Sequence, residues 1–245
     1  MKIVGVDYAT QDAKVGLALG VVSEGDLEIQ DAKLCRRERP PASVIASWLG
    51  DRQSAALIAI DAPLGWPKPL AECLIKHNAS AAIEATPDAM FRRETDLFIQ
   101  RELKKTPLDV GADRIARTAH AALRLLDELR RKLGLPIPLA WKLADISPIA
   151  VIEVYPAATL VAHGIRCTGY KKPGQAKQRR EIMDALRTKM TIQDCVPDLS
   201  ASGHLVDAVV CVLAGADFIL QRAMSPEDQR LAEHEGWIWA SRRQP

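Results

Sequence analysis

A β-strand that returns after a helix constrains this fold more than any other feature of the sequence. The chain opens with the apolar run KIVGVDYAT (residues 2–10), and a second apolar run, SAALIAIDAP (54–63), follows a segment with helical spacing (40–51). Strand, helix and strand in this order imply a right-handed crossover and parallel pairing. We therefore expect the two strands to be parallel neighbours, with Asp7 and Asp61 at one edge of the sheet, where open α/β sheets bind ligands.

Three further runs complete the predicted sheet. The β-rich runs at 13–22 and 26–34 follow the first strand through short turn signals, so the three strands should form an antiparallel meander. The strand pattern resumes in IAVIEVY (149–155) after a long interval. The sequence therefore predicts a mixed sheet of five core strands, three in the meander and two parallel.

Helical patterns fill the rest of the chain. The clearest amphipathic helix covers 112–134, another helix lies near 175–188, and an apolar, hence buried, helix lies within 202–223. Together with the strands, these helices indicate an α/β layered fold. We predict a single domain over residues 1–245, with a helical insertion at about 63–148 between the fourth and fifth core strands.

Composition favours a soluble protein without disulfides. The five cysteines are odd in number and form no CxxC pair, which indicates neither a disulfide framework nor a thiolate zinc site. The first residues do not resemble a secretory signal, and the longest apolar run, 208–216, is far shorter than the roughly 20 residues that span a bilayer. We expect a cytoplasmic protein that is not associated with membranes.

Charge is distributed unevenly along the chain. The formal net charge is +2, yet residues 166–189 carry eight basic side chains and two acidic ones. A basic segment of this kind can contact the phosphates of a nucleic acid, although a solvated helix surface explains it equally well.

Four carboxylates lie in apolar surroundings. Asp7 and Asp61 end their strands, Glu153 interrupts an apolar strand, and Asp207 lies in the last helix three residues after His204. Singly, each has a structural explanation: a strand-end Asp starts a turn, an Asp near a helix start favours the macrodipole, and a strand Glu reaches solvent. Together, unpaired acids that converge in an apolar setting repel one another, and a divalent cation would remove that cost.

The predicted ligand set selects a hard cation. Carboxylates without cysteine favour Mg²⁺ or Mn²⁺, and two such ions about 3.5–4 Å apart can activate water and stabilise the leaving oxygen of a phosphodiester. In this scheme Asp7 bridges the metals, and Asp61, Glu153 and Asp207 complete the shell as catalytic ligands. His204 either assists protonation or has a structural role.

The chain resembles the predicted-nuclease family called domain of unknown function 429, within the ribonuclease H-like superfamily. The resemblance is carried, in order along nearly the whole chain, by the motifs GVDYAT, IAIDAPLGWP, RRETD, IEVYPAA, GYKK, VDAVVCVLAGA and EGWIW. It implies a central five-stranded sheet and metal-binding roles for Asp7, Asp61, Glu153 and Asp207. It implies no known substrate, because activity in this family is itself inferred from fold and motif.

Three more residues are candidate substrate contacts. Family members tend to have an Arg followed shortly by an Asp in the RRETD region, so Arg93 would clamp a phosphate and Asp96 would line the same cleft. A local ion pair at a helix start is the structural alternative. In GYKK, Tyr170 offers a stacking ring and Lys171 a phosphate contact.

The favoured function is a metal-dependent nuclease that hydrolyses DNA or RNA. One alternative is nucleotide phosphate binding or hydrolysis of the actin and sugar-kinase kind, although the chain has a single such domain and no Walker A or GxGxxG motif. Another is a non-catalytic binding protein on the same fold. Trp237 and Trp239 are expected in either a late strand or the contact of a homodimer.

Overall fold

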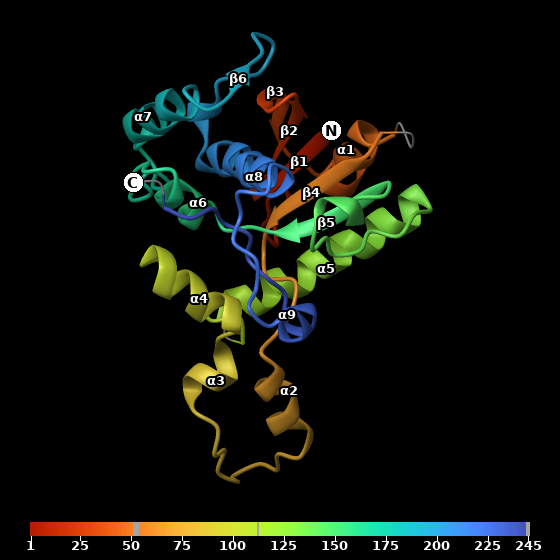
Figure 1. The fold of residues 1–245 in the computed structure, drawn as a ribbon, viewed down its shortest axis with the longest axis vertical. Helices are drawn as coiled ribbons and strands as arrows, with labels where there is room; N and C mark the ends of the chain where they lie inside the picture. Colours follow the sequence, from red (N-terminus) through yellow and green to blue (C-terminus); the bar gives the residue numbers. More distant parts are fainter. Residues whose placement is uncertain (51–53, 112, 244–245) are drawn as a thin grey trace.

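The central feature of the molecule is a six-stranded mixed sheet with the strand order β5-β4-β1-β2-β3-β6 (Figure 1). The computed structural model describes residues 1–50, 54–111 and 113–243. The strands are β1 (Lys2–Asp7), β2 (Gly16–Ser23), β3 (Asp26–Leu34), β4 (Ala56–Asp61), β5 (Ile149–Glu153) and β6 (Thr191–Ile192).

The predicted strand pairing is confirmed, but the predicted number of strands is wrong. Strands β1, β2 and β3 form an antiparallel meander, and β4 is parallel to both β1 and β5. The sixth strand, β6, pairs parallel to β3 through two residues. A strand of this length shows no alternation of apolar and polar residues, so periodicity could not reveal it.

Helices cover both faces of the sheet. They are α1 (Pro41–Trp48), α2 (Lys68–Ile75), α3 (Pro87–Phe91), α4 (Glu94–Leu103), α5 (Asp113–Leu133), α6 (Pro156–Ala162), α7 (Ala176–Leu186), α8 (Gly203–Ile219) and α9 (Gln229–Glu235). Helix α5 matches the amphipathic pattern, and Gly134 follows it in the left-handed conformation with φ +64°. Ala112, where that helix was expected to begin, lies outside the described residues.

Alternation along the strands builds two core layers. In β1, Ile3 packs in the layer under α8, whereas Val4 and Val6 pack in the layer with α1 and α5. In β4, the odd-numbered Leu57 likewise lies on the α8 side. Since successive side chains point to opposite faces, Asp7 and Asp61 leave their strands on the face that α8 covers.

Helix α8 approaches this face closely because the strands beneath it carry glycine. A Cβ atom on Gly5 would lie 2.1 Å from the carbonyl oxygen of Ala208, and one on Gly16 would lie 2.1 Å from that of His204. Real Cβ atoms do not come so near to backbone. The two glycines therefore set the depth of α8 over the sheet.

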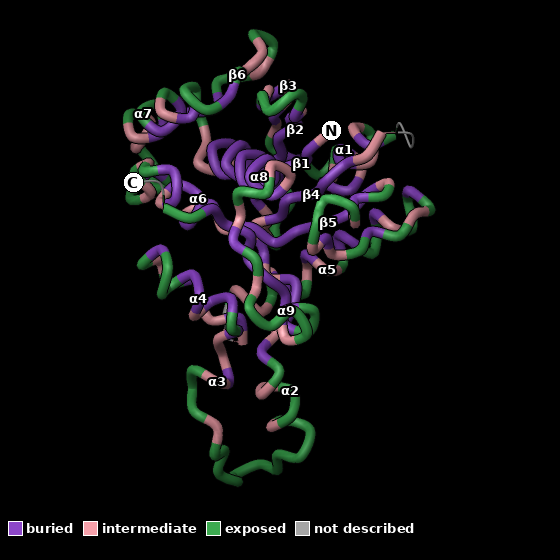
Figure 2. The backbone as a smooth tube through the Cα atoms, in the orientation of Figure 1, coloured by how far each residue is buried: buried purple, intermediate pink, exposed green. Residues whose placement is uncertain are grey.

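The chain between β4 and β5 is helical, and part of it projects from the body of the molecule. Helices α2 and α3 and their connection form an arm that extends away from the sheet (Figure 1). Most of the arm is exposed (Figure 2), and no residue of α2 is buried. Helices α4 and α5 return to the body of the molecule. There Phe98 of α4 packs in the core layer under α8, and Leu126 of α5 packs in the layer on the other face of the sheet.

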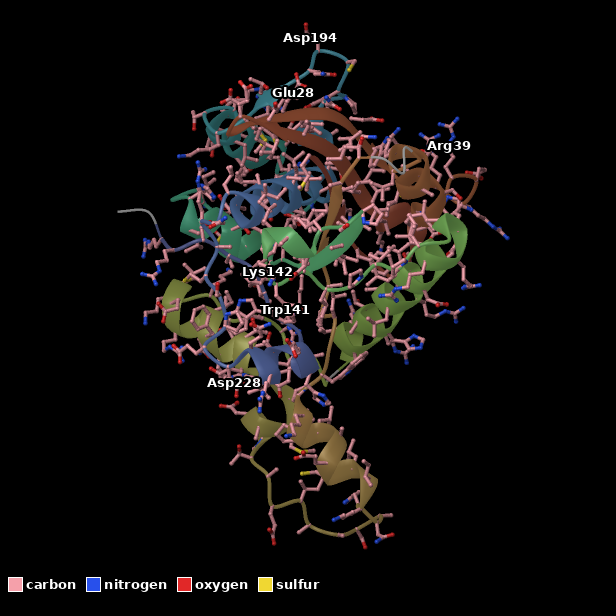
Figure 3. All side chains as sticks on the ribbon, turned by 45° about the vertical axis from the view of Figure 1, so that its right-hand side comes forward. Glu28, Arg39, Trp141, Lys142, Asp194 and Asp228 are labelled. Atoms are coloured by element: carbon pink, nitrogen blue, oxygen red, sulfur yellow. The ribbon has the colours of Figure 1, made fainter. Side chains whose placement is uncertain are left out.

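The tryptophans near the end of the sequence lie in the core of the same chain. Trp237 and Trp239 are buried, and the backbone N–H of Trp239 donates to the Glu153 carbonyl at 2.9 Å. The Trp239 ring lies 6.3 Å from that of Trp141, which Figure 3 labels. Their interpretation as an exposed dimer contact is wrong. A homodimer formed through another surface stays a prediction.

Among the described residues, every helix is too short or too polar to cross a membrane.

The close approach of α8 predicts a large effect of one added methyl group. In Gly5→Ala the new Cβ would overlap the Ala208 carbonyl, so we expect the free energy of unfolding to fall by about 3 kcal/mol, the upper end for overpacked cores. Urea denaturation measures this loss. The control is Gly50→Ala, whose Cβ makes ordinary contacts at 3.5 Å and should change stability by less than about 0.5 kcal/mol. Equal stability of the two variants would refute this packing argument.

Candidate functional site

Three aspartates from three elements meet at the carboxyl edge of the sheet. The register pairs Asp7 of β1 directly with Asp61 of β4. Asp207 reaches them from α8, next to Ala208, whose carbonyl faces Gly5. One oxygen from each of the three carboxylates lies within 4.8 Å of the other two. These residues are called the aspartate cluster below.

Burial makes the aspartate cluster electrostatically costly. Asp207 is fully buried, Asp7 is 6% exposed and Asp61 is partly buried. Burial raises the pKa of Asp61 well above its usual range; Asp7 and Asp207 add to the shift, and Lys171 opposes it. Burial likewise raises the pKa of Asp207 to about 6, against the attraction of Lys171. The cluster thus disfavours its own negative charge.

Two basic side chains, Lys171 and His204, lie against the cluster. Lys171 forms an ion pair with Asp207, and His204 Nδ1 lies 2.5 Å from Asp7 Oδ2. The hydrogen bond to Asp7 raises the pKa of His204 against the effect of burial. Burial opposes the charge of Lys171, but Asp207 and its neighbours outweigh it and raise the pKa of this ammonium. Sequence reasoning looked for bases only near each acid in the chain and so missed the pair between Lys171 and Asp207.

Tyr170 belongs to the buried side of the site. The Tyr170 hydroxyl donates to Asp207 Oδ1, and Tyr170 is only 2% exposed. The expectation of a stacking ring for a base is therefore wrong, because the ring faces the interior.

The donor set of the cluster suits a hard divalent cation. Carboxylate oxygens are the preferred ligands of Mg²⁺ and Mn²⁺. Asp207 Oδ2 is buried and accepts no well-formed hydrogen bond from the described residues, and its close charged neighbour is the Lys171 ammonium. The position beside Asp207 Oδ2 thus already holds a positive charge, and it fits a site where a metal cation can take the place of the ammonium.

Glu153 lies apart from the aspartate cluster. Strand β5 pairs Glu153 with Ile60 of β4, and the side chain of Ile60 packs on the face covered by α1 and α5. Because paired residues share a face, the Glu153 side chain leaves the sheet on the face opposite to Asp61. Both of its carboxylate oxygens accept from Arg93, Oε1 at 2.7 Å and Oε2 at 2.8 Å. Burial raises the pKa of Glu153 even against this pairing.

Arg93 and Asp96 form a buried ion network with Glu153. Arg93 is 1% exposed, and its Nε and Nη2 donate to Asp96 at 3.1 and 2.9 Å. Its backbone N–H donates to Asp96 at 2.9 Å, which caps α4. Every side-chain nitrogen of Arg93 thus has a partner within the protein. This geometry favours a positioning role over the predicted phosphate clamp.

Sequence reasoning missed Glu235, which joins this network to two helix starts. Glu235 is buried, and its carboxylate oxygens accept from the backbone N–H groups of Lys68 at 2.7 Å and Glu94 at 2.9 Å, the first residues of α2 and α4. Gly65 permits this contact, because a Cβ there would lie 2.4 Å from the Glu235 carbonyl oxygen. The acidic residue of the motif EGWIW was the available signal.

Asp7 and Asp61 of the aspartate cluster and the Arg93 network open onto one cavity of about 380 Å³. Asp7, Asp61 and Lys171 line one part of its wall, and Arg93 and Glu153 line another. Sequence reasoning did not find Lys105 and Tyr155, which line the same cavity. Burial, with help from Asp61, raises the pKa of Tyr155 to about 12, so this phenol keeps its proton. The cavity, called the acidic cavity below, offers carboxylates and two ammonium groups to a ligand.

A mixed sheet with acids gathered at the ends of two parallel strands defines an α/β protein with a candidate cation-binding site at the sheet edge. Residues 5–230 match the family described as "Protein of unknown function (DUF429)", and the chain belongs to this family. None of the curated proteins compared with the chain matches it. The family predicted from the motifs is thereby confirmed, and the nuclease activity stays a prediction.

Adjacent arginines give a test of the buried network. Arg93→Met leaves Asp96 and Glu153 buried without a counter-ion, so we expect the free energy of unfolding to fall by about 3–5 kcal/mol. Arg92→Met is the matched control. It removes partly exposed ion pairs to Asp88 and Asp109 and should cost about 1 kcal/mol or less. Thermal and urea denaturation compare the two, and equal losses would count against a structural network around Arg93.

The charge cost of the aspartate cluster predicts that a neutral residue stabilises it. In metal-free buffer at pH 7, Asp61→Asn should raise the midpoint of thermal unfolding by about 2–4 °C, roughly 1 kcal/mol for a chain of this size. The raised pKa of Asp61 means that its ionised form weakens the fold. The gain should shrink as the pH falls through that raised pKa towards about 4, the unfolded value, since wild-type Asp61 is then neutral.

The contrasting variant for this test is Asp96→Asn, which breaks a buried ion pair and should lower the midpoint. If Asp61→Asn also lowers it at pH 7, Asp61 is a structural turn residue and the functional interpretation of the cluster fails.

Proposed function

We propose that this chain is a metal-dependent nuclease with a ribonuclease H-like fold. The observation that supports it most is the convergence of Asp7, Asp61 and Asp207 on one buried position beside a cavity. A three-strand meander followed by two parallel strands is the core that the family resemblance implies. The sixth strand lies at the far edge, next to β3, and leaves the site unchanged.

In this proposal Asp7, Asp61 and Asp207 hold Mg²⁺ or Mn²⁺. The bound cation supplies Lewis-acid polarisation of a phosphodiester and activation of water. Glu153 was predicted as a fourth ligand, but with both oxygens on Arg93 it acts as a positioning residue that fixes the end of β5 beside the cluster.

The cationic residues of the site bind and orient the substrate. The side chain of Lys171 is half-exposed, and its ammonium can contact a phosphate at the mouth of the acidic cavity. His204 Nδ1 lies 2.5 Å from Asp7 Oδ2, and this contact holds the ring beside the cluster. The basic segment 166–189 extends the positive surface along which a nucleic acid backbone can lie.

Calorimetric titration of Mn²⁺, followed by a cleavage screen over single- and double-stranded DNA and RNA, tests the proposal. Wild type should bind Mn²⁺ and cleave at least one substrate. Asp7→Asn, Asp61→Asn and Asp207→Asn should each weaken Mn²⁺ binding at least tenfold, the effect of about 1.4 kcal/mol, and lower cleavage by a factor of 100 or more, on the order of 3 kcal/mol. The stoichiometry, one or two ions per chain, decides whether the two-metal scheme applies.

Asp127→Asn is the control, because it removes an exposed carboxylate from an ion pair on α5 and should leave binding and cleavage unchanged. ATP is included as the substrate of the alternative phosphotransfer function. A wild type that binds no divalent cation, with or without oligonucleotide, would overturn the proposal in favour of a non-catalytic binding protein.

A further inference from the structure

A second cavity, of about 220 Å³, lies beside the aspartate cluster and has the opposite charge. Four basic side chains line it: Lys171, Lys172, Arg179 and His204. The other described lining residues are Pro173, Ala201, Ser202 and Gly203, and none of them carries a carboxylate. It is called the basic cavity below. Like charges gathered around a hollow favour an anion inside it.

Arg179, a residue of α7, is a buried cation without a counter-ion among the described residues. It is 8% exposed, and its guanidinium donates to the carbonyl oxygens of Ser200 at 2.6 Å and Tyr170 at 2.9 Å, with a longer contact to Lys172. Among the described residues no carboxylate forms an ion pair with it. Neutral carbonyls hold the guanidinium in place but do not cancel its charge, and a buried charge left uncompensated is costly. An anion in the basic cavity would compensate it.

The first turn of α8 forms another part of the wall. Ser202 caps this helix by accepting from the His204 backbone N–H at 3.2 Å, and Gly203 begins it. A Cβ on Gly203 would lie 3.3 Å from Lys171 Cα, so glycine lets the lysine loop pack against the helix start. The positive end of the helix dipole adds to the charges of the side chains.

The basic cavity adjoins the acidic cavity through shared residues. Lys171 lines both cavities, and its ammonium pairs with Asp207. His204 lines the basic cavity while its ring contacts Asp7. A chain of phosphates that passes over the aspartates therefore meets the basic cavity next.

From this geometry we infer that the basic cavity is a subsite for a phosphate group, built from Lys172, Arg179 and the first turn of α8. This inference rests on the proposed nuclease function, because that function supplies the source of the phosphate. The bound group is a phosphate of the substrate backbone adjacent to the one at the aspartate cluster. Lys172 contributes an ammonium with no ion pair among the described residues, and Arg179 contributes a fixed positive charge.

Binding in metal-free buffer tests this subsite. Inorganic phosphate is titrated by calorimetry, and a fluorescent single-stranded oligonucleotide is titrated by anisotropy at several salt concentrations. Lys172→Ala should weaken both by about tenfold, as for loss of one charge-assisted hydrogen bond. The slope of log affinity against log salt for the oligonucleotide should fall by about 0.7, the value for one phosphate contact on a single strand.

Lys177→Ala is the matched control, because Lys177 is exposed on α7, carries the same charge and does not line the basic cavity. It should leave phosphate binding within about twofold of wild type, since surface charges far from a contact act weakly. Circular dichroism confirms that each variant is folded, and Lys172 is exposed, so its replacement should not disturb the fold.

Each outcome decides between the interpretations. Loss of phosphate binding in Lys172→Ala but not in Lys177→Ala supports the subsite. Equal losses in both variants indicate diffuse charge and overturn it, as does a wild type that binds no phosphate. If wild type binds phosphate through Lys172 but neither binds nor cleaves oligonucleotides, the subsite is supported for a free phosphate compound and the nuclease proposal fails. The phosphate and oligonucleotide binding measurements need no metal, so they succeed or fail independently of the Mn²⁺ titration, whereas cleavage is taken from the screen described above.

Discussion

The close packing of α8 on β1 and β2 is the constraint on which the site depends. Gly5 and Gly16 let the helix lie so near the sheet that Asp207 comes within reach of Asp7 and Asp61. Two unit charges about 4–5 Å apart repel by roughly 3–4 kcal/mol at an effective dielectric constant near 20. Such repulsion persists in a fold only where something else offsets it, here the nearby cations in part and a ligand in our proposal.

Two groups of buried acids share one cavity but differ in how their charge is balanced. Glu153 and Asp96 surround Arg93 with short, well-formed hydrogen bonds, which is typical of a fixed structural network. Asp207 has a tyrosine hydroxyl on one oxygen and the half-exposed Lys171 near the other. The Arg93 network fixes the backbone around the cavity. The side chains around Asp207 are the ones that a cation or a phosphate can rearrange.

Sequence patterns predicted the meander, the parallel strands and the convergence of Asp7 with Asp61, because strand order and crossover handedness leave few arrangements. They could not place Glu153, since its face depends on the register with Ile60, and a shift of one residue moves a side chain to the other face. Contacts between distant segments, such as Lys171 with Asp207, have no local signal. The basic segment was recognised as a charge run, but its cavity arises only when α7 packs beside the start of α8 (Figure 1).

Glu235 has a consequence for the order in which the molecule is assembled. Its carboxylate holds the starts of α2 and α4, and the segment after it pairs with the end of β5. On the ribosome, residues 68 and 94 emerge long before residue 235, and domains complete their folding as units. The helical insertion and the cavity wall beside it therefore lack these stabilising contacts until residue 235 and the segment after it have been synthesised.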